Sequence, residues 1–158
     1  MPKAIPLLLQ MIDEAYERKT WHGPNLKGSL RGLSADEAAW RPSPKRHNIW
    51  EIAVHAAYWK YTLRRRLLGE KRGSFPLKGS NWFHRPETVS DAEWKHDLRM
   101  LDDVHRSMRE AIAAFPDDRL YQKIPNSKYT YVATIFGLAN HDIYHAGQIQ
   151  LLKRLRRR

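Results

Sequence analysis

Four long stretches of this chain repeat their apolar residues at steps of three and four, which is the periodicity of amphipathic helices. They run over about residues 4–19, 49–68, 91–115 and 130–154. Helix-stopping residues follow them, because Gly23-Pro24, Gly69 and Pro116 stand just beyond the first three. No convincing alternation of apolar and polar residues indicates a strand. The pattern predicts an all-α fold built as a four-helix bundle.

The connections between these stretches predict how the helices are ordered. A linker rich in Gly, Pro and Ser, about residues 69–88, joins the second stretch to the third. Its length allows a crossover, so the second and third helices are expected to run parallel. Ser34 should cap a short helix at 35–40, and Ser90 with Glu93 predicts a capping box for the third long helix. With 158 residues, we expect one domain spanning 1–158.

The composition excludes several kinds of chemistry. The chain has no cysteine, so disulfides, thiolate ligands and a cysteine nucleophile are ruled out. Asp13 and Glu14 interrupt the N-terminal apolar run, which does not resemble a signal peptide. The uncharged stretch 129–141 is too short to span a bilayer. We therefore expect a soluble cytoplasmic protein without a membrane partner.

The chain is strongly basic, with 28 Lys and Arg against 17 Asp and Glu and a net charge of +11. The excess gathers in three runs, at 64–66, 71–72 and 153–158. Solvated helix ends are one interpretation, because the helix dipole favours cations near a C-terminus. A nucleic-acid surface is the other. Few aromatic residues interleave with these runs, so a platform that stacks single-stranded bases is not indicated.

The fourth helical stretch contains an anomaly at its core-facing seam. In order, the seam reads Ile135, Leu138, His141, His145, Gln148, Leu152 and Leu155. Its three central residues are polar, and burying an unpaired polar group costs roughly 1–3 kcal/mol. A shared partner would remove that cost. The spacing of four residues places the two histidines on one face, about 6 Å apart along the axis, where both imidazoles can converge on one metal ion.

The second helical stretch offers a third imidazole. His55 stands at the border of its apolar stripe, three residues after Ile52 and four before Trp59. Three neutral imidazoles on one ion leave a coordination position open, which is typical of catalytic rather than structural metal sites. Gln148 is a candidate to orient a ligating histidine from the second shell. Glu51, one turn before His55, is a candidate general base.

The histidines and tyrosines of the chain also allow interpretations without a metal ion. The eight histidines of the chain can also form a hydrogen-bonded network in a core without metal. His105 is expected to be a core histidine bonded to a carbonyl, with a fourth-ligand role as the alternative, and His22 lies near a helix stop. Tyr58 and Tyr144 can donate hydrogen bonds near the metal, or simply pack in the core with a solvated hydroxyl.

Two segments resemble motifs of the DinB/YfiT-like superfamily. The segment NIWEIAVHAAYW around His55 is similar to its second-helix motif, and HDIYHAGQI, from His141 to Ile149, is similar to its fourth-helix motif. The segment WHGP at 21–24 and the short helix after Ser34 resemble one branch of it. The likeness covers nearly the whole chain, and the basic charge and arginine tail depart from it.

The resemblance implies a fold, a metal site and a range of reactions. It implies an up-up-down-down bundle, often dimeric, in which His55, His141 and His145 bind zinc, nickel, iron or manganese. Some relatives use the metal to activate a low-molecular-weight thiol, such as bacillithiol or mycothiol, for transfer or isomerisation. It therefore suggests a metal-dependent enzyme acting on a small molecule, working as a homodimer.

Two functions are in competition. The first is a metal-dependent S-transferase or hydrolase, whose thiol must come from a co-substrate because the chain has no cysteine. The basic surroundings favour an anionic thiol in that role. The second is a basic stress-response protein that binds nucleic acid, with a structural metal or none.

Overall fold

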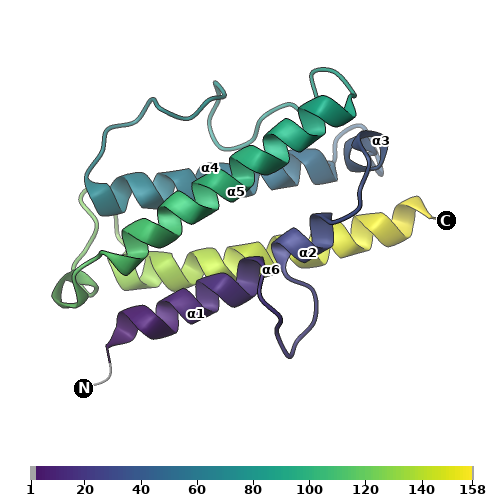
Figure 1. Ribbon diagram of the computed structural model, residues 1–158. Helices are drawn as coiled ribbons and strands as arrows, with labels where there is room; N and C mark the ends of the chain where they lie inside the picture. Colours follow the sequence, from purple (N-terminus) through teal and green to yellow (C-terminus); the bar gives the residue numbers. More distant parts are fainter. Residues whose placement is uncertain (1–2, 158) are drawn as a thin grey trace.

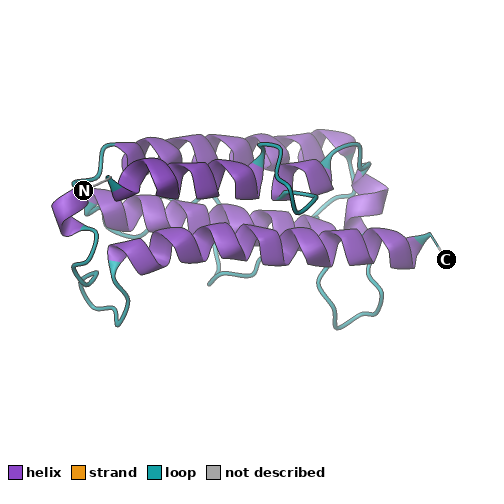
Figure 2. Cartoon of the chain, turned by 90° about the horizontal axis from the view of Figure 1, so that it is seen from below, coloured by secondary structure: helices purple, strands orange, loops and turns teal. Residues whose placement is uncertain are grey.

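The computed structural model describes residues 3–157, and that part of the chain is helical with no β-strand (Figure 2). Its long helices are α1 (Ala4–Tyr16), α4 (Ile49–Leu68), α5 (Asp91–Ala113) and α6 (Tyr131–Arg156). Its short ones are α2 (Leu26–Leu30), α3 (Ala35–Ala39) and the 3-10 turn η1 (Asp117–Arg119). The all-α class predicted from periodicity is confirmed. No helix within the described range has the length and apolarity needed to cross a membrane.

Helix ends are set by local side-chain chemistry, and α4 shows this best. The Asn48 side chain accepts from the backbone N–H of Glu51, while the Glu51 carboxylate accepts from the N–H of Asn48. This capping box satisfies N–H groups that the first turn cannot pair. Gly69 ends the helix in the left-handed conformation, with φ of 70°, which a residue without Cβ adopts freely. The predicted bounds of this helix, 49–68, are therefore correct.

The capping box predicted for the third long helix forms only in part. Ser90 does accept a hydrogen bond from the backbone N–H of Glu93. The Glu93 carboxylate, however, accepts from the N–H groups of Glu87 and Thr88 instead of Ser90. The connection before α5 turns back on the helix and supplies these closer donors. A complete capping box stands at Ser34, which begins α3 as predicted.

Side-chain pairs along the helices fix their directions. Two pairs join α4 to α5 and two join α1 to α5: Trp50–Asp97, Arg64–Ser107, Tyr16–Asp102 and Asp13–Arg109. From the first pair to the second, the residue numbers increase in both helices, so α4 and α5 run parallel, as expected from the long connection. From the third pair to the fourth, the residue number falls in α1 and rises in α5. Helix α1 is therefore antiparallel to α4 and α5, as Figure 1 shows.

The order is therefore up-down-down-up, and the up-up-down-down order expected from the resemblance is wrong for this chain. The reason lies between the first and second long helices. After α1, the chain continues in the same direction through α2, which packs on α6, and then through α3 (Figure 1). These short helices bring the chain to the far end of the molecule, so α4 must run back. Only α3 was expected from the sequence.

The long connection between α4 and α5, residues 69–90, is more than a linker. Phe83 is 6% exposed and belongs to the main apolar core, with Phe75 and Trp82 packed against it. Arg85, also 6% exposed, donates to Asp97 of α5, and its carbonyl accepts from Asn48. The connection is thus tied to the start of α4 and to α5. This places its residues beside the histidines of α4 and α6.

Candidate metal centre

Three histidines from two antiparallel helices converge inside the protein. The Nε2 atom of His141 lies 3.2 Å from Nε2 of His55 and 3.0 Å from Nε2 of His145. All three histidines offer nitrogens within 4.8 Å of one another. Ligand nitrogens placed tetrahedrally about 2.1 Å from an ion stand about 3.4 Å apart, close to these separations. The three residues singled out in the sequence are the three that the fold brings together.

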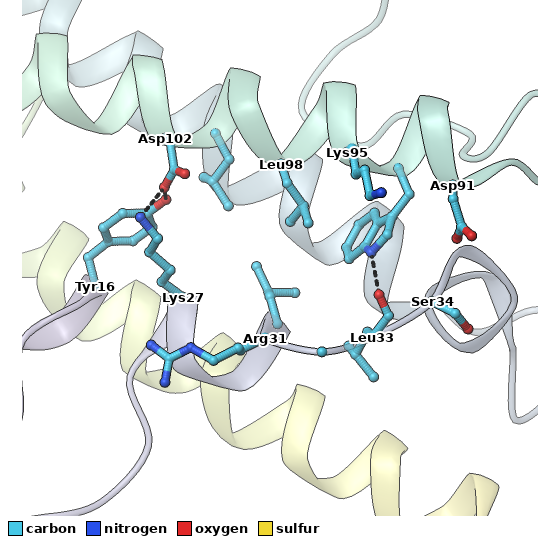
Figure 3. A pocket seen from close by; sticks show the side chains of 13 residues that line it. Tyr16, Lys27, Arg31, Leu33, Ser34, Asp91, Lys95, Leu98 and Asp102 are labelled. Atoms are coloured by element: carbon cyan, nitrogen blue, oxygen red, sulfur yellow. Dashed lines mark hydrogen bonds and ion pairs between the residues drawn. The ribbon is translucent and has the colours of Figure 1, made fainter.

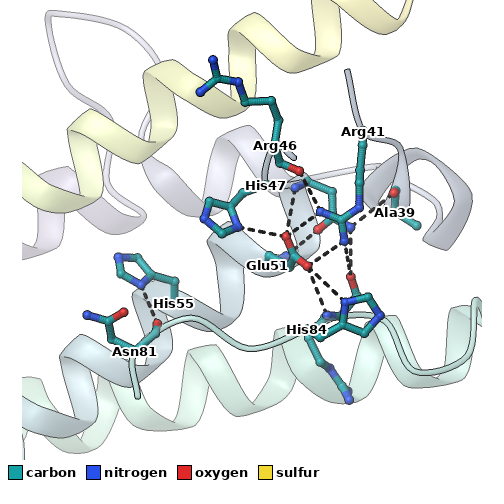
Figure 4. Close-up of polar contacts among 10 residues, drawn as sticks. Ala39, Arg41, Arg46, His47, Glu51, His55, Asn81 and His84 are labelled. Atoms are coloured by element: carbon teal, nitrogen blue, oxygen red, sulfur yellow. Dashed lines mark hydrogen bonds and ion pairs between the residues drawn. The ribbon is translucent and has the colours of Figure 1, made fainter. Parts of the chain in front are cut away.

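The hydrogen bonds of two of the rings determine which of their nitrogens carries the proton. His55 Nδ1 lies 2.6 Å from the carbonyl oxygen of Asn81, which can only accept, so Nδ1 carries the proton (Figure 4). His145 Nδ1 lies 2.6 Å from Oε1 of Gln148 in the same relation. Both Nε2 atoms therefore present lone pairs towards His141. The Nε2 atom of His141 cannot donate a hydrogen bond to both of them. A cation at the centre would accept the lone pairs of all three rings, so these residues fit a metal ion.

Burial keeps these imidazoles neutral, which is the form that binds metal. It lowers the pKa of His55 to about 4, against the bond to Asn81, which acts in the opposite direction. It lowers the pKa of His141 to about 3, with repulsion from the two neighbouring imidazoles adding to the shift. It also lowers the pKa of His145. The lone pairs are therefore free of protons at neutral pH.

Two residues that support His55 come from the long connection and were missed in the sequence. Asn81 accepts from the ring through its backbone, so the identity of its side chain gives no signal. The Trp82 ring stacks on His55 at 3.8 Å between centroids, and on its other face stacks on His47 at 3.6 Å. This sandwich holds the ligand ring in one plane. Irregular backbone without periodicity gave no indication of either contact.

The described contacts of Glu51 lie away from the three imidazoles, and its expected role as a general base stays a prediction. Its carboxylate receives two hydrogen bonds from Arg41, at 2.8 and 2.6 Å, and lies 3.1 Å from the His47 ring (Figure 4). It also accepts from the backbone N–H of Asn48 and of Arg85. Its described contacts thus face the start of α4 and the long connection rather than the three imidazoles. The sequence carried the signal, because Asn48 and Glu51 have the spacing of a capping box.

Two expected second-shell residues form a chain beside His145. Gln148 accepts from His145 through Oε1 and donates from Nε2 to the hydroxyl of Tyr144 at 3.0 Å. Tyr144 is largely exposed, so its hydroxyl reaches solvent. Tyr58 instead packs among aromatic rings of the long connection, 5.3 Å from Phe75 and 5.6 Å from Phe83 between centroids. Its position agrees with the packing role considered for it.

The remaining candidate histidines lie apart from the cluster. His105 of α5 is buried and stacks on Tyr16 at 3.7 Å, and neither of its nitrogens has a hydrogen-bond partner among the described residues. The expected carbonyl bond is therefore wrong. His22 is exposed in the loop between α1 and α2, next to Trp21.

Several cavities flank the helices, and among those of the described residues the one lined by a histidine of the cluster is a groove beside His141. A groove of about 410 Å³ between α4 and α6 has His141 in its wall, and we call it the histidine groove. A pocket of about 480 Å³ lies between α2 and α5, lined at one end by Tyr16, Lys27 and Asp102 (Figure 3). The pocket between α2 and α5 is therefore separate from the candidate metal ligands.

The described part of the chain is helical, and three imidazoles converge between two antiparallel helices. These features define a helical protein with a candidate metal site. The family model of the DinB superfamily matches residues 20–149, and the chain belongs to this superfamily. The match contains all three histidines and leaves α1 outside. No curated protein and no solved structure matches the chain.

Proposed function

We propose that this protein is a metal-dependent enzyme of the DinB type, with His55, His141 and His145 as the ligands of one divalent ion, either zinc, nickel, iron or manganese. The observation that carries the proposal is the convergence of three Nε2 atoms, with the rings of His55 and His145 oriented from behind by Asn81 and Gln148. In the same proposal the four long helices form the bundle of this superfamily. A core network without metal would leave these lone pairs facing one another.

An ion on three imidazoles supplies Lewis acidity, which can activate water or a small thiol. The residues of the chain then position the ion and admit the substrate. Trp82 and Gln148 fix the orientation of two ligand rings, and the histidine groove gives a small molecule access to His141. Because the chain has no cysteine, a thiol must arrive as a co-substrate. We therefore propose an S-transferase that uses a small anionic thiol, or a hydrolase.

Metal analysis and activity together test this proposal. Protein purified without a histidine tag should hold about one of the four metals per chain, and the His141→Ala/His145→Ala variant should hold none. Metal-loaded protein should transfer a small thiol to an electrophile, or hydrolyse an ester, and His55→Ala should abolish the turnover. Equal and negligible metal in wild type and double variant contradicts the proposal, as does turnover that survives His55→Ala.

We also propose that the protein is a homodimer. The outer face of α6 carries an exposed apolar stripe at helical spacing, formed by Phe136, Tyr144, Leu151 and Leu155. A two-fold interface presents the same patch from each subunit, which suits a single self-complementary stripe. Light scattering should give the mass of two chains for wild type and of one chain for Leu151→Glu. A monomeric wild type contradicts this part of the proposal.

The net charge of +11 favours nucleic acid as a second candidate partner. Several basic side chains are already engaged within the protein, since Arg64 pairs with Glu70 and Arg156 pairs with Glu37. DNA affinity that falls steeply as salt rises would support a nucleic-acid role. Absence of binding at low salt excludes it.

A further inference from the structure

The histidine groove extends well beyond the candidate metal ligands. From His141 it runs along α4 and α6 to Arg66, with Trp59, Leu63, Gly137 and Leu138 between them. His55 and His141 stand at one level, because their rings touch. Arg66 is eleven residues after His55, which is about 16 Å along a helix axis. A ligand that reaches from one end to the other must therefore be elongated and apolar in its middle.

Arg66 differs from the two arginines that precede it. Arg64 binds Glu70 and Ser107, and Arg65 donates to the carbonyl of Glu70. Among the described residues, the Arg66 guanidinium has neither a hydrogen bond nor an ion pair. The half-buried Arg66 side chain lines the histidine groove and also a neighbouring cavity beside Gly69 and Arg119. Burial lowers the pKa of Arg66, and repulsion from Arg65 and Arg72 lowers it further. The groove thus contains a cation without a compensating anion.

A guanidinium in such a place binds carboxylate or phosphate through paired hydrogen bonds. We propose that the histidine groove binds an elongated acid, whose anionic group pairs with Arg66, whose apolar body lies along Trp59 and Leu138, and whose donor atom meets the histidine cluster. The last contact rests on the proposed function, whereas the first two do not. The inference thus defines the substrate class, a metal-binding donor joined to a distant acid.

Calorimetry with zinc-loaded protein and a matched pair of probes tests the contact with Arg66. The probes are ω-mercaptohexanoate and mercaptohexanol, which differ only in the terminal acid. Wild type should bind the acid about tenfold more tightly, because a charge-assisted hydrogen bond adds to its affinity. Arg66→Gln should remove that preference with the zinc content unchanged. Arg65→Gln, which removes the same charge outside the groove, should change the preference by less than about twofold.

Gly137 provides a second test that does not alter charge. A Cβ built at Gly137 meets no atom within 4 Å, so a side chain there projects into open space without disturbing the helix. Gly137→Leu should therefore fold, hold zinc as wild type does, and weaken both probes about tenfold by filling the groove.

Three results would overturn the inference. They are equal affinity of wild type for the acid and the alcohol, equal effects of Arg65→Gln and Arg66→Gln, or unchanged binding in Gly137→Leu. A protein that takes up none of the four metals refutes the proposed function instead. In that case hexanoate and hexanol, titrated into metal-free protein, still decide whether Arg66 selects the acid.

Discussion

Two buried polar clusters meet at neighbouring residues of α6, and they are built on opposite principles. The histidine cluster consists of His55, His141 and His145, three like groups whose lone pairs face one another. The ion-pair cluster begins one residue on, where Asp142 binds Lys60 of α4 with both side chains fully buried. The Lys60 ammonium also lies 4.7 Å from the centre of the Tyr16 ring.

The two clusters differ in whether their members can pair with each other. The two opposite charges of the ion-pair cluster contact each other and link α4 to α6, although Oδ1 of Asp142 has no hydrogen-bond partner among the described residues. The three like imidazoles of the histidine cluster cannot pair in this way, and the proposed metal ion would be the partner that they share. The ion-pair cluster therefore joins α4 to α6, and the histidine cluster between the same helices is the proposed site of the metal ion.

Breaking the ion-pair cluster should have the largest effect. Lys60→Met leaves Asp142 buried without its partner, and we expect the free energy of unfolding of metal-free protein to fall by about 3–5 kcal/mol. Urea denaturation measures this. The Lys60→Met/Asp142→Leu variant should recover most of the loss, because it removes both charges. A single variant that loses less than about 1 kcal/mol would show that the pair does not hold the helices together.

Removing support for the histidine cluster should change metal binding instead of folding. Gln148→Ala deletes the acceptor behind His145, and zinc affinity should fall about 10–100-fold while the stability of metal-free protein changes little. Competition with a chelating dye measures the affinity. Gln150→Ala, whose amide contacts Ser29 on the other side of α6, is the matched control and should leave zinc affinity unchanged. Equal losses in both variants would contradict the second-shell role.

His105 should make stability depend on pH. Burial, together with the charges of Lys60, Arg109 and Lys27, lowers its pKa to about 2, and the buried Tyr16 ring covers it. Below its ordinary pKa the unfolded chain binds a proton that the folded chain does not, so acid favours unfolding. Between pH 6 and 4 this costs up to about 1.4 kcal/mol per pH unit.

In His105→Leu the loss of stability per pH unit should be smaller by that amount, because all other histidines are shared with wild type. Urea denaturation of metal-free protein at several pH values measures both slopes. Identical slopes would show that His105 takes up its proton in the folded state.

Replacing Glu51 should have the smallest effect and separates its two roles. Glu51→Gln keeps an oxygen for the capping box but removes the charge paired with Arg41, so we expect a stability loss of about 1 kcal/mol. Zinc affinity and turnover should stay as in wild type. Turnover that falls with stability unchanged would support the general-base role.

The sequence predicted the helices and the pairing of His141 with His145 well, because both depend on residues close together in the chain. The end of α4 followed from Gly69, and the histidine pair followed from a break in one apolar seam. His55 was harder to place, because it comes from another helix. It was found because a polar residue on an apolar stripe needs a partner wherever it lies.

Residues outside the periodic stretches could not be predicted in the same way. Asn81 contributes a backbone carbonyl and Trp82 a ring face, and neither contact depends on a local pattern. The unpaired state of Arg66 was equally hidden, since its two arginine neighbours have partners and the sequence reads as one basic run.

By itself the sequence determined an all-helical protein whose core contains three imidazoles, because helix periodicity and the cost of burying polar groups act over short stretches of chain. The direction of α1, the support of His55 by the long connection, and the groove that ends at Arg66 could be seen only in the folded protein. Those features arise where segments far apart in the chain pack together, and that packing depends on the whole molecule.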